Sequence, residues 1–164
     1  MENASKALIM AAGVLIGILI LSLAVYLFVS FGTTSAELHR QNDANRTNEF
    51  NTQFTKYVGS DDVTIYTIVS LANIATENNI EYELPKVTSI INDNSYSRFY
   101  VQVVYDNKPI EGGYNTPSAT DYNTLIKNDT QEITSANQEL KKYECTTYIS
   151  SSTQRVYKVV FNEK

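Results

Sequence analysis

Residues 7–31, ALIMAAGVLIGILILSLAVYLFVSF, contain no charged side chain and decide the architecture of this chain. As an α-helix that rises about 1.5 Å per residue, they extend about 37 Å. A helix of this length crosses a hydrocarbon core about 30 Å thick with some tilt. A chain of 164 residues cannot form an interior that buries such a helix on all sides. The sequence therefore predicts a transmembrane helix at residues 7–31, in contact with the lipid bilayer.

The residues on either side of the apolar stretch favour a retained signal anchor over a cleaved signal peptide. The stretch is about twice as long as the core of an ordinary signal peptide, and before it Glu2 offsets the charge of Lys6. Thr34-Ser35-Ala36 supports the alternative, a small-residue cleavage site. The positive-inside rule barely separates the two orientations. We expect residues 1–6 to be a short cytoplasmic tail and the large polar part of the chain to lie outside.

Two features of the N-terminal helix predict contacts with other helices. Inside the apolar stretch, two glycines form a G-x-x-x-G pair, which lets another helix approach closely in a membrane. In the polar segment that follows, residues 32–58, three aromatic residues recur at helical spacing. We expect this segment to be a stalk or an extension of the same helix, stopped at Gly59. The helix-packing candidates are Gly13, Gly17, Phe50, Phe54 and Tyr57.

Residues 59–164 have the length of one small domain, and their apolar pattern predicts the α+β class. Ser60-Asp61-Asp62 offers N-cap oxygens and first-turn acids to a helix whose apolar residues run from Ile65 to Ala75. Asn78-Asn79 is expected to end that helix. After Pro85 the apolar period becomes alternating, which is typical of strands.

The alternating segments predict an antiparallel sheet of about four or five strands. The strongest pattern is FYVQVVY at residues 99–105, and the clearest hairpin lies near the C-terminus, with a turn at residues 150–154. Asp106-Asn107 is expected to form another turn, and residues 122–126 a short helix or ordered loop. The expected strands are residues 87–91, 99–105, 110–114, 143–149 and 155–161.

The charge pattern excludes binding to nucleic acid by phosphate neutralisation, which needs clustered basic residues. The chain has 13 Lys and Arg against 18 Asp and Glu, for a net charge of -5. Its longest basic run is the pair Lys141-Lys142. We therefore expect no nucleic-acid partner.

No constellation of residues predicts catalysis, a cofactor or a metal site. The only histidine, His39, lies in the polar segment, and the only cysteine, Cys145, occupies an inward strand position typical of a core residue. Zinc sites need several such ligands. We interpret Asp61-Asp62 as part of a helix cap. Asp93 with its asparagine neighbours, and Asp106-Asn107, lack the spacing of a calcium loop and are interpreted as turns.

Four stretches carry a resemblance to known proteins: MENASKALIMAAGVLIGILI (1–20), FNTQFTKYVG (50–59), VTIYTIVSLAN (63–73) and YISSSTQRVYKVVF (148–161). Through them nearly the whole chain resembles a group of short single-pass membrane-anchored proteins of Gram-positive gut bacteria. The resemblance implies a location in the membrane and no particular activity.

In architecture, a hydrophobic helix that continues into an amphipathic half and ends in an antiparallel sheet is similar to type IV pilins and pseudopilins. In those families the apolar helices pack in the centre of a filament. Their leader has a glycine directly before the apolar run and a glutamate at the fifth mature position. Here the first glycine is Gly13, inside the helix, and Glu2 precedes the run. The similarity is one of architecture, without the prepilin leader.

These observations lead to two hypotheses about function. The first is a non-enzymatic structural or assembly subunit of the cell envelope, pilin-like in architecture, that contacts itself or an envelope machine through its N-terminal helix. The second is a membrane-tethered extracellular binding module, in which the helix is only an anchor and the sheet carries a ligand surface.

Overall fold

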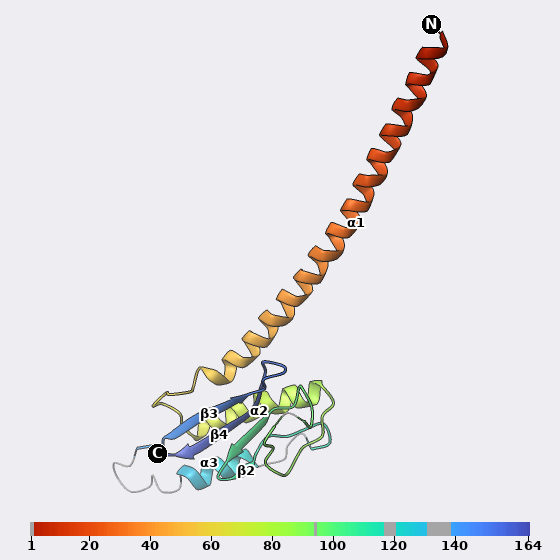
Figure 1. Cartoon of the computed structure of the whole chain (residues 1–164). Coiled ribbons are helices and arrows are strands. Elements are labelled where there is room, and N and C mark those ends of the chain that lie inside the picture. Colours follow the sequence, from red (N-terminus) through yellow and green to blue (C-terminus); the bar gives the residue numbers. More distant parts are fainter. Residues whose placement is uncertain (1, 94, 117–120, 131–138) are drawn as a thin grey trace. The chain divides into compact units, whose positions relative to one another are not determined.

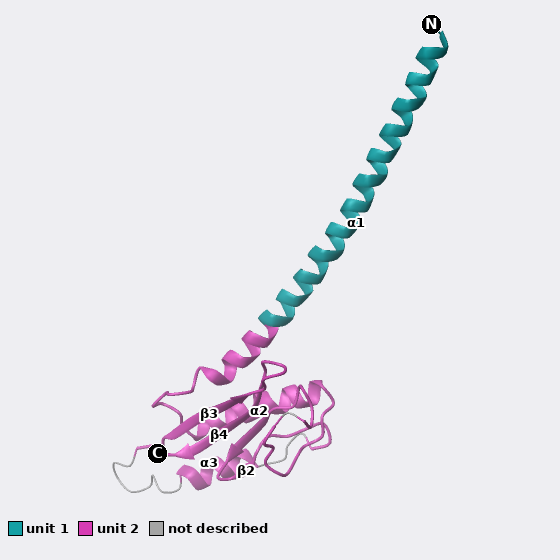
Figure 2. Cartoon of the chain, in the orientation of Figure 1, with its two compact units in different colours: residues 1–45 teal, residues 46–164 magenta. Residues whose placement is uncertain are grey.

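The computed structural model describes residues 2–93, 95–116, 121–130 and 139–164. The chain divides into two compact units, Met1–Asn45 and Arg46–Lys164 (Figure 2). One helix, α1 (Glu2–Thr55), forms the first unit and supplies the first residues of the second (Figure 1). The second unit thus begins before residue 59, where the sequence placed the domain boundary, because the last turns of α1 belong to its core.

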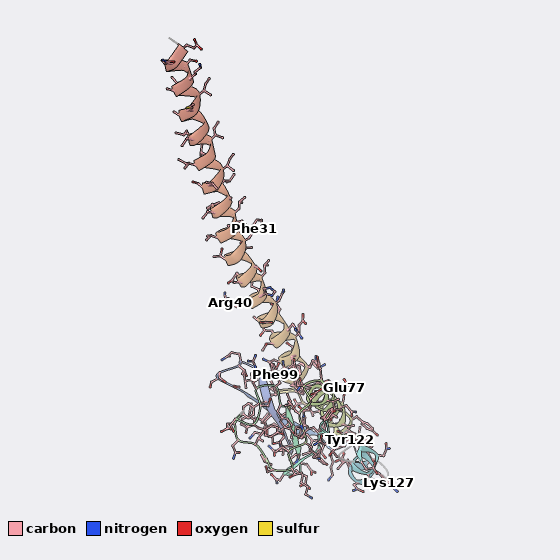
Figure 3. All side chains as sticks on the ribbon, turned by 90° about the vertical axis from the view of Figure 1, so that its right-hand side faces the viewer. Phe31, Arg40, Glu77, Phe99, Tyr122 and Lys127 are labelled. Atoms are coloured by element: carbon pink, nitrogen blue, oxygen red, sulfur yellow. The ribbon has the colours of Figure 1, made fainter. Side chains whose placement is uncertain are left out.

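The first unit is a helix whose apolar side chains are exposed. Phe28 is 81% exposed and Phe31 is 71% exposed, and side chains project from all sides of this helix (Figure 3). By length and composition α1 can span a membrane, and among the described residues it is the one helix that meets this test. Exposed apolar side chains are favoured in lipid over water, which fits single-pass membrane anchoring.

The polar residues after the apolar stretch continue the helix without a break. Of the two expectations for this segment, the helix extension is therefore confirmed. Arg40 pairs with Glu37 one turn away, with 2.7 Å between Nη2 and Oε1, which gives an exposed helix modest support. Leu38 is a lone apolar residue there and is 55% exposed. Apart from Leu38 and the alanines Ala36 and Ala44, the segment is polar up to the boundary of the second unit.

The second unit has the α+β fold expected from the sequence. Its sheet has four strands in the order β2-β1-β4-β3. Two helices accompany the sheet, α2 (Ile65–Glu81) and α3 (Tyr122–Thr130) (Figure 1). The strands are β1 (Gln102–Tyr105), β2 (Lys108–Pro109), β3 (Tyr143–Ile149) and β4 (Val156–Glu163).

Two strand pairs are antiparallel and the third is parallel. The β1–β2 turn contains Asp106 and Asn107, both with left-handed backbone (φ 48° and 56°), a conformation that these residue types tolerate. β3 and β4 form the predicted C-terminal hairpin. β1 and β4 run parallel, with Val103 opposite Val159. The expectation of a wholly antiparallel sheet is wrong at this pair, because the C-terminal hairpin joins the sheet through its second strand.

The core lies between α2 and one face of the sheet. Helical spacing predicts a buried face of α2 at Ile65, Ile68, Val69, Ala72 and Ala75. All of these residues are buried except Val69, which is only partly buried. Cys145 is also buried there, as expected, and burial raises the pKa of its thiol to about 11. The core residues from these elements are Ile65, Ile68, Leu71, Ala72, Ala75, Val103, Tyr143, Cys145, Val156, Val159 and Phe161.

The start of α2 differs from the prediction. The helix is capped at Thr64, which makes no side-chain capping bond, and not at Ser60-Asp61-Asp62. Val63 is fully buried, and its carbonyl accepts a hydrogen bond from the Tyr143 N–H (2.9 Å). This contact holds residue 63 in a strand-like position beside β3, so the helix begins only after it. Asp61 instead pairs with Lys164.

Candidate functional site

Two side chains of the sheet bind the segment that contains Ser89 and Ile91, on the face of the sheet opposite α2. Alternation along the strands places Gln102 and Lys158, which are opposite one another, on that face. Gln102 accepts a bond from the Ile91 N–H (2.9 Å) and donates to the Ser89 carbonyl (2.9 Å). Lys158 Nζ donates to the Ile91 carbonyl (2.8 Å). The predicted strand at residues 87–91 is therefore wrong, because side chains rather than a backbone ladder attach this segment.

The two asparagines expected to end α2 lie inside it and connect it to other elements. Asn79 is fully buried, and its side chain both accepts from the Val101 N–H (3.0 Å) and donates to the Val101 carbonyl (3.0 Å). It also donates to the Gly112 carbonyl (3.3 Å), while the Gly112 N–H donates to Thr76 Oγ1 (2.7 Å). These side chains satisfy backbone groups that would otherwise be buried without partners.

A buried carboxyl group, Glu111, completes this polar cluster and was missed in the sequence. Its side chain is fully buried. Oε1 accepts a bond from the Tyr100 hydroxyl (3.0 Å) and Oε2 accepts one from the Val103 N–H (2.9 Å). Burial raises the pKa of Glu111 to about 7, against the opposing effects of these bonds and of Lys86. The one sequence signal was an acid between Ile110 and two glycines, in a segment expected to be a strand.

The residues after Glu111 pass very close to another backbone segment. A Cβ on Gly113 would lie 2.3 Å from the Lys86 nitrogen, which no side chain could tolerate. The Tyr114 N–H donates to the Leu84 carbonyl (2.8 Å) in the same place. Gly113 therefore serves close backbone packing. The strand expected at residues 110–114 is wrong: the chain forms the short strand β2 at Lys108–Pro109, and Gly113 takes part only in an isolated bridge with Thr116. Glu111 is fully buried and both of its carboxyl oxygens are hydrogen-bonded within the domain, which leaves no space for a substrate beside it. We therefore assign the polar cluster around Glu111 a structural role.

The last turns of α1 are packed into the second unit. Phe54 is fully buried, and Phe50 packs against the same core. The Arg155 guanidinium lies 3.7 Å from the centre of the Phe50 ring, and its Nη2 donates to Asn78 Oδ1 (2.5 Å). Asn51 binds the end of the turn between β3 and β4. Its side-chain oxygen accepts a hydrogen bond from the Val156 N–H (2.8 Å), and its amide group donates one to the Gln154 carbonyl (2.7 Å).

The structure separates the five helix-packing candidates into two groups. Gly13 and Gly17 are exposed in the first unit, and an added Cβ at either would meet nothing within 4 Å. Phe54 is wholly enclosed and Phe50 and Tyr57 pack on the core of their own domain. The expectation that the aromatic stripe contacts other subunits is therefore wrong for Phe54, because folding of this chain already uses that side chain.

A pocket of about 420 Å³ lies where the ends of three strands meet. The carboxyl ends of the parallel strands β1 and β4 and the start of β3 form it. Beside it, the hydroxyls of Tyr143 and Tyr105 both donate to Asp129 Oδ1, the latter over 3.2 Å. Lys141 pairs with Glu163 across its rim (3.3 Å). The lining residues are Tyr105, Asp106, Asn107, Lys141, Tyr143, Phe161, Asn162 and Glu163.

The polar lining makes this pocket, among the described residues, a candidate for binding a small polar ligand. Its lining offers carboxylate, amide and ammonium groups around one hollow, and such polar groups can orient a ligand. No nucleophile with an adjacent base lies among its lining residues. The arrangement suits the binding of a polar ligand.

The remaining candidates from the sequence have local partners. His39 is exposed on α1. Asp93 Oδ1 accepts a bond from the Ser95 N–H (3.0 Å), as expected of a turn, while its neighbour Asn94 lies outside the described residues. Over the described part of the chain, no three His, Cys, Asp or Glu side chains gather as metal ligands would.

Comparison of the chain with protein-family models, with curated proteins and with solved structures finds no match.

Proposed function

We propose that this chain is a membrane-tethered, non-enzymatic binding module, whose α+β domain lies on the outer side of a cell membrane. One observation carries the proposal: the helix that is apolar over residues 7–31 also supplies Phe54 to the domain core. The same helix, α1, thus carries both the apolar stretch and a side chain of the domain core. The pocket at the carboxyl ends of β1 and β4 is the proposed ligand site.

The polar part of α1 supports the tether in particular. Residues 32–49 make up about 27 Å of helix at about 1.5 Å per residue. Because Leu38 is its one large apolar side chain, the segment has no apolar stripe with which to pack against a neighbouring helix. Such a helix is suited to act as a solvated spacer.

A pilin-like structural subunit is the second candidate. It is favoured by the open G-x-x-x-G face at Gly13 and Gly17 and by the unbroken course of α1 from its apolar part into the domain. The aromatic stripe is less favourable to it, because Phe54 is not available to another subunit.

Replacing residues 7–31 by a leucine and alanine span of equal length distinguishes the two candidates. For a tether, we expect the variant to remain in the membrane and to form the same assemblies as the unaltered chain, because any apolar helix serves as an anchor. Chemical crosslinking in membranes, followed by gel analysis, measures this. Loss of an assembly in the replaced chain, with membrane insertion intact, would favour the pilin-like role.

The proposed topology predicts how protease acts on intact protoplasts. Arg40 and Arg46 lie in the exposed polar helix. Trypsin added from outside should cut there and leave a membrane-bound fragment that contains residues 7–31. A chain with both residues changed to Gln should be cut later in the sequence and leave a longer fragment, which serves as the control. Full protection in intact protoplasts, with cleavage only after lysis, contradicts the outward orientation.

A further inference from the structure

The pocket at the carboxyl ends of β1 and β4 holds a carboxylate whose charge has no partner. Two acids, Asp106 and Glu163, and one cation, Lys141, line it. Lys141 Nζ lies 3.3 Å from Glu163 Oε1, so these two charges offset each other. The exposed Asp106 carboxylate forms no ion pair or hydrogen bond within the described ranges. The lining is therefore negative.

Another carboxylate lies behind the wall of the pocket. Asp129, which is 6% exposed, accepts hydrogen bonds at Oδ1 from the hydroxyls of two lining residues, Tyr105 and Tyr143. Its Oδ2 is buried and has no hydrogen-bond partner among the described residues. A buried carboxylate with incomplete hydrogen bonding is stabilised by a positive charge nearby. Asp129 thus adds to the negative potential within the pocket.

The surface that the pocket presents is polar rather than aromatic. Tyr143 and Phe161 are each 2% exposed, so their rings belong to the domain core. Asn107 and Asn162 are exposed lining residues, and their amide oxygens accept hydrogen bonds. A matching ligand supplies hydrogen-bond donors and positive charge, whereas an anion would be repelled and an apolar ligand would find little apolar surface.

We propose that this pocket binds a primary alkylammonium group, which donates hydrogen bonds to the Asp106 carboxylate and to the amide oxygens of Asn107 and Asn162. The inference rests on the proposed function and names the ligand class of its site. An ammonium group combines several N–H donors with one positive charge, and its hydrogen bonds to carboxylates are charge-assisted. A metal ion is less well served, because the described His, Cys, Asp and Glu side chains form no group of three that could hold one.

Titration of the full-length chain with n-butylammonium, in nonionic detergent micelles, tests the ligand class. Butan-1-ol and butyrate, which are close to it in size, are the neutral and anionic comparisons. Saturation-transfer NMR, with the signal of empty micelles subtracted, measures the dissociation constants. We expect about 1–10 mM for butylammonium, as for a very small ligand, and binding at least about tenfold weaker for the other two. The peptide acetyl-Gly-Lys-Gly-amide carries the same group, and tighter binding of it than of butylammonium assigns the source to a protein.

Asp106→Asn removes the charge and keeps the shape of the side chain. Asparagine tolerates the left-handed backbone at this position (φ 48°), so the turn is kept. We expect this variant to bind butylammonium about tenfold more weakly. Asp43→Asn, exposed on α1 in the first unit, removes an equal charge and should leave the dissociation constant unchanged. Equal melting temperatures of both variants and the unaltered chain show that the fold is retained.

Equal affinity of Asp106→Asn and Asp43→Asn for butylammonium would overturn the proposal. Displacement of butylammonium by calcium chloride at a lower concentration would assign the pocket to a metal ion and would also overturn it. Tighter binding of butyrate or butan-1-ol than of butylammonium would overturn the alkylammonium class and leave the pocket as a ligand site. If none of the probes binds, the ligand site of the proposed function fails together with the class.

Discussion

A fragment of residues 60–164 is expected to be unfolded or severely destabilised, whereas residues 46–164 should fold on their own. The reason is Phe54, a fully buried side chain that α1 contributes to the core. The longer fragment also retains Asn51, which bonds to Val156, and Phe50, which stacks with Arg155. Removing a buried Phe costs about 3–5 kcal/mol, a large part of the about 5–15 kcal/mol that stabilises an ordinary domain.

The substitution Phe54→Ala in residues 46–164 isolates the largest part of this effect. We expect its free energy of unfolding, from urea titration followed by circular dichroism, to fall by about 3–5 kcal/mol. Thr52→Ala, at an exposed position two residues before it, is the control and should fall by less than about 1 kcal/mol. Equal stability of residues 46–164 and 60–164 would mean that the domain core does not need α1.

The stability of the domain should depend on pH through Glu111. The pKa of this carboxyl is about 7 in the folded chain against 4.5 for an ordinary glutamate. The protonated form is therefore favoured by folding, so its stabilising contribution is fully present below about pH 4.5 and is lost as the pH rises through about 7. By linkage the loss amounts to about 3 kcal/mol at most. Stability should thus decline from pH 4.5 to 8 more than exposed acids alone would cause.

Glu111→Gln should remove this decline. The amide has the shape of the protonated carboxyl, so its oxygen can accept from the Val103 N–H and its NH2 can donate to the Tyr100 oxygen. We expect urea titrations between pH 4.5 and 8 to give a flatter profile for Glu111→Gln and higher stability at pH 8. Glu77→Gln, exposed on α2 (Figure 3), should keep the profile of the unaltered domain. Parallel profiles for Glu111→Gln and the unaltered domain would show that Glu111 ionises without cost.

Periodicity predicted the parts of the fold in which one apolar face repeats. The transmembrane candidate, the buried face of α2 and the hairpin of β3 and β4 each repeat over several residues, and each is present as expected. The turn at Asp106-Asn107 followed from residue types that accept left-handed backbone. In these cases local chemistry and the final packing favour the same conformation.

The features that were not predicted depend on pairs of residues distant in sequence. Asn79 looked like a helix end because asparagine favours ends, yet it lies inside α2 to bond Val101 and Gly112. No sequence pattern identifies Glu111, because its unusual property is its burial, and that burial results from packing against residues elsewhere in the chain. The segment at residues 87–91 has the alternation of a strand, but Gln102 and Lys158 occupy its hydrogen-bonding groups. Hydrogen bonds between single side chains and distant backbone groups do not repeat along the sequence, so the spacing of apolar residues does not reveal them.

The position of β4 has a consequence for the order in which the domain can fold. β4 follows every other described strand along the chain, yet it lies inside the sheet, between β1 and β3. Before β4 has left the ribosome, β1 can pair only with the two-residue strand β2, and β3 has no partner strand in the sheet. In the proposed topology, the polar part would therefore pass through the translocation channel as an unfolded chain. Assembly of the sheet would then follow synthesis, as a late step that closes contacts distant in sequence.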